Sequence, residues 1–141
     1  MSTASLIQEF FPSANQRFAV VGASSNRTKF GNKVLCWYIN HGYTAVPVNP
    51  KESVIETLTC VKNLSSLPGK PSEYHLSIIT PPSVTKFVLE EAHKNGITRI
   101  WLQPGVESPE ALAFAKDVGL HVIAGGPCVL IEGITSHQAK L

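Results

Sequence analysis

Short apolar runs alternate with amphipathic segments along most of the chain. The runs lack helical periodicity and predict strands at residues 17–23, 43–48, 75–80, 98–102 and 120–124. The segments between them predict helices at residues 33–41, 83–96 and 108–118, with a short helical turn at 63–67. An additional helix is expected at residues 5–11, where Pro12 ends it. Strands and helices therefore alternate.

This alternation is the sequence form of a parallel sheet with crossover helices. We predict an α/β fold, a Rossmann-like, doubly wound, five-stranded parallel sheet. Right-handed crossovers favour the strand order 3-2-1-4-5, numbered along the chain. Residues 1–141 are expected to form a single domain, with an amino-terminal capping helix within residues 1–12.

Composition narrows the class of protein. Hydrophobic residues make up 43% of the 141 positions and charged residues 16%, which is a globular balance. The net charge of +2 is spread along the chain, so nucleic-acid binding has no electrostatic support. Cys36, Cys60 and Cys128 lack metal-site spacing and indicate a reducing compartment. Neither a signal peptide nor a membrane span is evident, so we expect a cytoplasmic monomer or homodimer without metal.

Polar or glycine-rich segments follow every predicted strand, at residues 22–31, 49–51, 80–82, 103–107 and 125–128. Ligands of open α/β sheets bind beyond the carboxyl ends of the strands. The first segment, GASSNRTKFG, presents backbone amides at a helix start, where they suit a phosphate, with Arg27 and Lys29 as cations. Neither common phosphate motif, GxGxxG or GxxxxGK, is present. Strand two ends at Asn49 rather than an acid, which disfavours NAD, whereas Lys51 suits an extra phosphate near a ribose.

Five marks in this order resemble a known family. They are VVGAS followed by Lys29 and Gly31, PVNPK at 47–51, TPP at 80–82, WLQPG at 101–105, and Cys128. The chain is similar to the CoA-binding domain that also forms the amino-terminal part of the succinyl-CoA synthetase alpha chain, and most of all to its small free-standing members.

The resemblance implies a cofactor site for coenzyme A or an acyl-CoA. It assigns the phosphates to the loop from Ala23 to Lys29, the adenosine end to Lys51, the flanks of the nucleotide to Thr80–Pro82, and the pantetheine arm to Gln103–Gly105. The predicted cofactor-binding residues are Gly22, Ala23, Ser24, Ser25, Arg27, Lys29, Asn49, Lys51, Thr80, Pro81, Pro82, Gln103, Pro104, Gly105 and Cys128.

Catalytic groups are not evident. Five histidines, His137 among them, lack a recognisable nucleophile partner, and Asp117, the sole aspartate, lies in a predicted helix. Synthetases of the resembled family carry a phosphorylated histidine in a separate downstream domain, so ligase chemistry by this chain alone is not expected. For Cys128 two interpretations stay open: a mixed disulfide with the CoA thiol, or a small apolar packing residue.

Three hypotheses follow. The first is a binding protein for CoA or acyl-CoA, acting as sensor, carrier or thiol buffer without catalysis. The second is an NADP-binding oxidoreductase with Arg27 and Lys51 on the 2′-phosphate. The third is a subunit of a multi-chain acyl-CoA synthetase whose partner chain is unknown.

Overall fold

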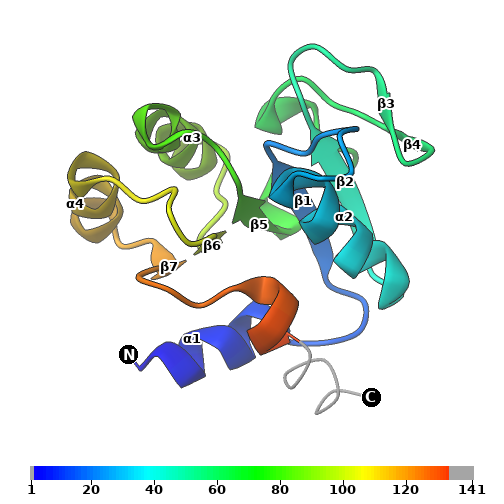
Figure 1. Cartoon of the computed structure of the whole chain (residues 1–141). Coiled ribbons are helices and arrows are strands. Elements are labelled where there is room, and N and C mark those ends of the chain that lie inside the picture. The colour runs from blue at the N-terminus through cyan, green and yellow to red at the C-terminus, as the bar shows by residue number, and fades with distance from the viewer. Residues whose placement is uncertain (1, 134–141) are drawn as a thin grey trace.

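The computed structural model describes residues 2–133, so His137 lies outside the described residues. One parallel sheet runs through the middle, in the order β2-β1-β5-β6-β7 (Figure 1). Its strands are β1 (Arg17–Val21), β2 (Thr44–Val48), β5 (Tyr74–Ile78), β6 (Arg99–Leu102) and β7 (His121–Ile123). The helices are α1 (Thr3–Phe10), α2 (Phe30–Asn40), α3 (Pro82–Lys94) and α4 (Pro109–Val118). An α/β fold with a five-stranded parallel sheet is confirmed.

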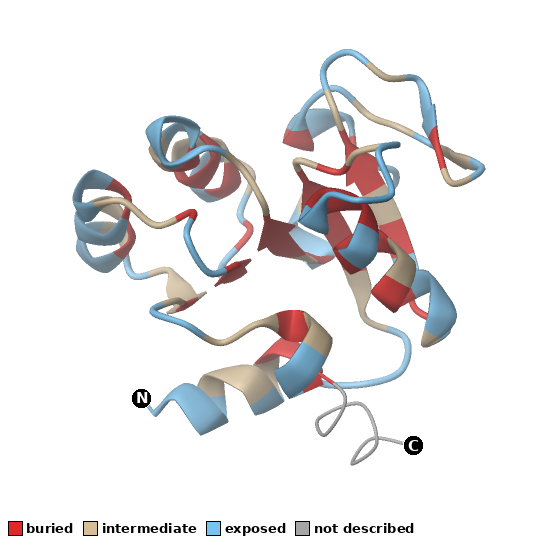
Figure 2. Ribbon diagram, in the orientation of Figure 1, coloured by how far each residue is buried: buried red, intermediate tan, exposed pale blue. Residues whose placement is uncertain are grey.

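Helices cover both faces of the sheet, as expected for a doubly wound fold (Figures 1 and 2). Successive residues of a strand point to opposite faces. In β1, Ala19 and Val21 join the core cluster that includes residues of α3 and α4, whereas Phe18 and Val20 join the cluster that includes residues of α1 and α2. Every one of these four side chains is buried, which explains why β1 reads as a continuous apolar run.

The predicted strand order 3-2-1-4-5 is wrong. The third sheet strand, β5, pairs with β1 rather than with β2, so the order along the chain is 2-1-3-4-5. Pro47 gives the physical reason: it lies in β2 and has no N–H to donate, which confines it to an edge strand. The predicted order would have placed β2 between two neighbours. In the observed order β2 is the edge of the sheet.

The connection from β2 to β5 is the least regular part of the fold. It contains the antiparallel pair β3 (Val54–Ile55) and β4 (Leu58–Thr59), which sequence patterns did not predict, and the 3-10 turns η1 (Leu64–Ser66) and η2 (Pro71–Glu73). The predicted helical turn at 63–67 is therefore a 3-10 turn. Glu56 and Thr57 form the β3–β4 turn with φ angles of 47° and 68°, values that usually call for glycine or asparagine. Without those residues the turn carries no sequence signal.

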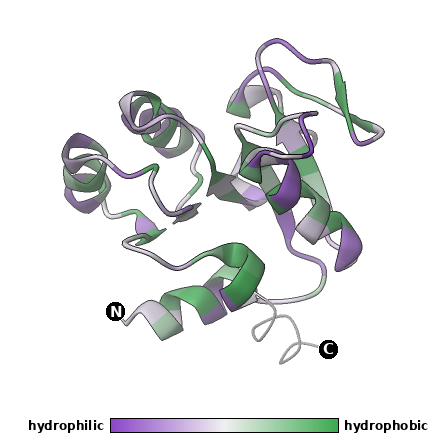
Figure 3. Ribbon diagram, in the orientation of Figure 1, coloured by the Kyte–Doolittle hydropathy of each residue, from purple (hydrophilic) through white to green (hydrophobic). Residues whose placement is uncertain are grey.

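A cluster of aromatic side chains fills the face of the sheet beneath α1 and α2. Phe18 stacks on Tyr38 with 4.5 Å between ring centroids, and Phe10 from α1 packs edge-on against Trp101. The helical segment at residues 129–133 lies on the same side and is strongly hydrophobic (Figure 3). Within residues 2–133, no helix combines the length and apolar character needed to cross a bilayer.

Candidate functional site

The order of the strands sets the order of the loops at their carboxyl ends. From one edge of the sheet to the other, the loops after β2, β1, β5, β6 and β7 follow one another. Neighbouring strands lie about 4.8 Å apart, so the five loops extend over about 19 Å. From β1 the chain first adds β2 on one side, and then returns to add β5 on the other side of β1. Open α/β sheets bind ligands at the point where the strand order reverses in this way. The corrected order thus arranges the predicted site residues in a line.

Two glycines bring the β1–α2 loop close to the sheet. Gly22 has a φ of +91°, and a Cβ there would lie 2.0 Å from the carbonyl oxygen of Ile79 at the end of β5. A Cβ on Gly31, in the first turn of α2, would lie 2.1 Å from the carbonyl oxygen of Gly22. Only glycine fits at either position, because backbone atoms on both sides leave no room. The start of α2 is thereby held against the end of β1.

A cleft of ≈ 500 Å³ lies at this loop. Its lining consists of Gly22, Ala23, Ser24, Thr28, Lys29, Phe30, Gly31, Asn49, Ile79 and Pro81. Lys29 is the N-cap residue of α2, and no side chain caps the helix there. The first amides of a helix carry a partial positive charge, and Lys29 adds a full one. The cleft therefore offers the groups that bind a phosphate.

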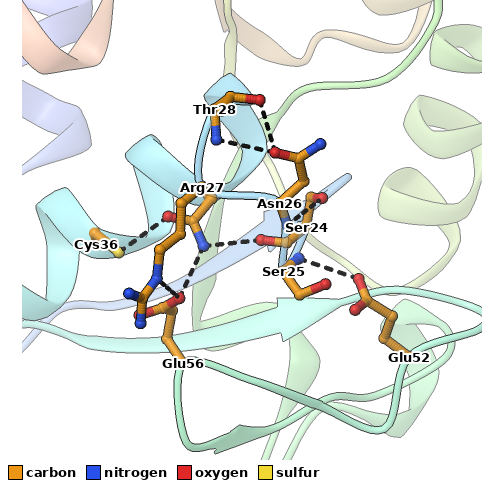
Figure 4. A network of polar contacts seen from close by, with 9 residues as sticks. Ser24, Ser25, Asn26, Arg27, Thr28, Cys36, Glu52 and Glu56 are labelled. Carbon is orange, nitrogen blue, oxygen red and sulfur yellow. Dashed lines mark hydrogen bonds and ion pairs between the residues drawn. The ribbon is translucent and has the colours of Figure 1, made fainter.

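The β1–α2 loop is braced by its own side chains (Figure 4). The amide of Asn26 donates to the hydroxyl of Ser24 at 3.0 Å, and the amide of Thr28 donates to the Asn26 side-chain oxygen at 3.0 Å. The buried side chain of Asn32, in α2, donates to the Ser24 carbonyl at 3.0 Å. Because these bonds fix the loop before any ligand arrives, less ordering is needed on binding.

Two acidic residues from the β2–β5 connection also contact this loop (Figure 4), and sequence reasoning missed both. Glu52 accepts a hydrogen bond from the Ser25 amide at 3.1 Å. Glu56 forms an ion pair with Arg27 at 3.2 Å and accepts from the Asn32 side chain at 3.0 Å. The hydrogen bonds from Asn32 and then Arg27 lower the pKa of Glu56 below its ordinary value. Arg27 is thus engaged by Glu56, which leaves Lys29 as the cation that lines the cleft.

Asn49 joins the end of β2 to the end of β1. Its side-chain nitrogen donates to the Ala23 carbonyl at 2.9 Å. Its oxygen accepts from the amides of Lys51 and Glu52, at 2.7 Å and 2.9 Å. An aspartate at position 49 could not donate to the Ala23 carbonyl. This contact explains why an asparagine follows β2 here, rather than the acid that holds the ribose in NAD-binding folds. Lys51 lies in the loop that follows β2, at the outer edge of the sheet, and its side chain is exposed.

A second pocket of ≈ 380 Å³ lies further along the line of loops. Phe30, Ile79, Gln103, Pro104, Cys128, Leu130 and Ile131 line it. Phe30 and Ile79 also line the first cleft, so the two cavities adjoin one another. The first lies at a helix start and has both polar and apolar walls, whereas the second is mostly apolar.

Gln103 and Cys128 are the polar members of the second pocket, and they contact each other. The Gln103 side-chain nitrogen donates to the Cys128 sulfur at 3.3 Å, and its oxygen accepts from the Val129 amide at 2.9 Å. Gln103 is only 3% exposed. Since the Val129 amide fixes which way the side-chain amide faces, its nitrogen has to point at the sulfur. Cys128 itself is half-buried.

The remaining predicted site residues lie nearby but line neither of these two cavities. The hydroxyl of Thr80 lies 2.9 Å from that of Thr85, and Pro82 begins α3. The amide of Gly105 donates to Glu107 at 2.8 Å. Ser25, Arg27 and Lys51 are the others. Across residues 2–133, no three side chains of metal-binding type gather into a metal site.

Comparison with known proteins matches this geometry to a family. The family model described as CoA binding domain matches residues 16–134. A conserved hypothetical protein from Pyrococcus furiosus shares 34% identity over 83% of this chain and 98% of its own, with a TM-score of 0.76. A hypothetical protein from Pyrococcus horikoshii shares 26% identity over 96% of this chain and 92% of its own, with a TM-score of 0.83.

A larger protein is similar over part of its length. The dinucleotide-forming acetyl-coenzyme A synthetase 1 of Ca. Korarchaeum cryptofilum, in complex with phosphate and ADP, shares 25% identity with a TM-score of 0.67. The match covers 80% of this chain but 26% of the synthetase chain. The family model, by contrast, spans most of the present sequence. The protein therefore belongs to the CoA binding domain family.

Proposed function

We propose that this protein binds coenzyme A or an acyl-CoA along the carboxyl edge of its sheet. The observation that carries the proposal is the junction of the two cavities, which share Phe30 and Ile79. One cavity offers amides and a lysine at a helix start, and the other offers apolar walls. Coenzyme A has the same division, with phosphates at one end and a long pantetheine arm at the other. Membership of the CoA binding domain family supports the assignment.

The line of loops gives the cofactor a direction. The pyrophosphate lies at residues 22–31 with Lys29 as its cation, and the adenosine with its 3′-phosphate extends towards Asn49 and Lys51. The pantetheine arm passes Phe30 and Ile79 and ends in the pocket of Gln103. This direction rests on the strand order, because β2 and β6 lie on opposite sides of β1.

The two acids at the loop sharpen the assignment. A phosphate that used the Ser25 amide would displace the carboxylate of Glu52, which accepts from that amide in the free protein. Arg27 pairs with Glu56 in the free protein and does not line the cleft. We therefore assign phosphate binding to the helix start and Lys29 rather than to Arg27.

The proposed role is binding, as a carrier or sensor, rather than catalysis. The polar side chains that line the two cavities are hydroxyls and amides, together with one amine and one thiol. None of the histidines in the described residues lines either cavity. Proton transfer at neutral pH usually depends on a histidine or a carboxylate placed beside the reacting atom.

Calorimetric titration in reducing buffer tests the proposal. CoA should bind, and dephospho-CoA should bind more weakly because it lacks the 3′-phosphate. Loss of one cationic partner typically costs about tenfold in affinity. Lys29→Gln should weaken both ligands, whereas Lys51→Gln should weaken CoA and leave dephospho-CoA unchanged.

Lys94→Gln is the matched control, because Lys94 lies in the last turn of α3, at the opposite end of the sheet from the loops. It should bind CoA like the unmodified protein. Absence of heat with CoA at millimolar concentration, or equal loss in all three variants, would overturn the proposal.

A further inference from the structure

We propose that the pocket beside Cys128 receives the acyl group of an acyl-CoA and selects uncharged aliphatic chains. This inference rests on the proposed function, since it concerns the far end of the same ligand. The pocket lies where the pantetheine arm would end, two strands beyond β1. The atoms that follow the thiol of CoA, in any thioester, are those of the acyl chain.

The walls of the pocket are suited to hydrocarbon. Phe30, Ile79, Pro104, Leu130 and Ile131 supply apolar surface around ≈ 380 Å³. Phe30 and Ile131 are large hydrophobic residues that are nevertheless 56% and 69% exposed. Surface apolar groups that surround a pocket are typical of ligand sites. An aliphatic chain in the pocket would cover both side chains and gain hydrophobic free energy.

The Gln103 side chain is held in place by its neighbours. The Gln103 oxygen accepts from the Val129 amide, and its nitrogen donates to the Cys128 sulfur. Neither lysine nor arginine is among the residues that line the pocket. The ammonium of Lys33 lies over the outer wall, 5.4 Å from the Phe30 ring centroid, but is not part of the lining. A carboxylate beside Gln103 and Cys128 would lose hydration without an ion-pair partner among the lining residues, which is unfavourable. Acyl groups that end in a carboxylate should therefore be rejected.

Chain length provides a quantitative test. Each methylene moved from water into an apolar site strengthens binding by a factor of about four. Butyryl-CoA has two more methylenes than acetyl-CoA, so it should bind about fifteenfold more tightly. The gain should stop when the pocket is full. No such trend is expected if the thioester end lies in solvent.

The experiment is a competition series on the unmodified protein in reducing buffer. CoA is bound first and displaced with acetyl-, butyryl-, hexanoyl- and succinyl-CoA, and the dissociation constants are compared. We expect butyryl-CoA to bind more tightly than acetyl-CoA, and succinyl-CoA to bind more weakly than butyryl-CoA. Equal constants across the series, or succinyl-CoA equal to butyryl-CoA, would overturn the acyl pocket while leaving CoA binding intact. Failure of CoA itself to bind refutes the proposed function instead.

A pair of variants locates the effect. Ile131→Ser should reduce the preference for butyryl-CoA over CoA severalfold and leave the affinity for CoA unchanged, because Ile131 lines only the second of the two cavities. Phe87→Ser is the control: Phe87 is 68% exposed on α3 and lines neither cavity. An unchanged preference in Ile131→Ser contradicts the proposal. Because the chain-length series needs no variant, the test stands even if Ile131→Ser folds poorly.

Discussion

Replacing Gly22 by alanine should destabilise the protein much more than replacing Gly105 by alanine, although the two glycines have the same φ angle. Both have a φ of +91°. In that region an L-residue costs about 1–2 kcal/mol relative to glycine. This penalty is common to both variants. Any difference between them must come from what the new methyl group meets.

The surroundings of the two glycines differ sharply. At Gly105 a Cβ would meet nothing within 4 Å, whereas at Gly22 it would lie 2.0 Å from the carbonyl oxygen of Ile79. That contact belongs to backbone, and the Ile79 amide is itself bonded to the Val21 carbonyl at 2.8 Å. Relief therefore requires β1 and β5 to separate locally. Overpacking of this kind typically adds about 1–3 kcal/mol.

Urea denaturation monitored by tryptophan fluorescence measures both variants against the unmodified protein. We expect Gly105→Ala to lose about 1–2 kcal/mol of unfolding free energy and Gly22→Ala to lose about 2–5 kcal/mol. CoA affinity should fall in Gly22→Ala as well, because the same contact fixes the phosphate loop. Equal losses of stability in the two variants would refute the close approach of loop and strand.

Three further predictions concern buried or reactive side chains. Burial lowers the pKa of His75, so on acidification the unfolded chain takes up a proton at this residue before the folded protein does. The contribution of His75 to the unfolding free energy should therefore be fully present above about pH 6.5 and be lost as the pH falls below that value. In urea denaturation at several pH values, His75→Gln should make this loss smaller. Tyr38→Phe should cost about 1–3 kcal/mol, because it leaves the Ser77 hydroxyl, 2.6 Å away, buried without its partner. Adding Ser77→Ala should recover part of that loss in the same denaturation assay, and no recovery would contradict the reasoning. CoA should slow alkylation of Cys128 by iodoacetamide but not that of Cys60, which lies on the β2–β5 connection and lines neither cavity. Peptide mass spectrometry measures both rates, and equal protection would count against the proposed position of the cofactor.

Local patterns were sufficient to predict the five sheet strands and the main helices. Ser108, the first residue of the helix predicted at 108–118, is the N-cap of α4: its side chain accepts from the Ala111 amide, and Gly119 ends α4 with a left-handed φ of 77°. These features depend on residues close together in sequence, so the sequence carries them directly. The central strand was equally easy to predict, because β1 is apolar from Phe18 to Val21.

Strand order was harder, because it depends on pairing between distant segments. The informative residue was Pro47, which has no N–H to donate to a second neighbouring strand and therefore fits an edge strand. Giving it that weight would have placed β5 on the other side of β1. The order matters for function, since it decides which loops are neighbours.

The contacts of Glu52 and Glu56 with the β1–α2 loop could not be predicted. Both acids come from a segment without helical or strand periodicity, and the turn that presents Glu56 is made by residues with unusual positive φ. Glu56 pairs with the exposed Arg27, and Glu52 accepts from the Ser25 amide. A sequence shows which charges exist but not which of them neutralise one another.

The central claim is that one cofactor occupies both cavities, with its phosphates at the β1–α2 loop and its thiol end beside Cys128. Amide chemical-shift mapping tests it most directly, with ADP and CoA added in turn under reducing conditions. ADP should shift amides at residues 22–31 and 49–51, whereas CoA should shift these together with residues 103–105 and 128–131. Shifts confined instead to the separate groove of Leu112 and His121, or identical maps for ADP and CoA, would contradict the account.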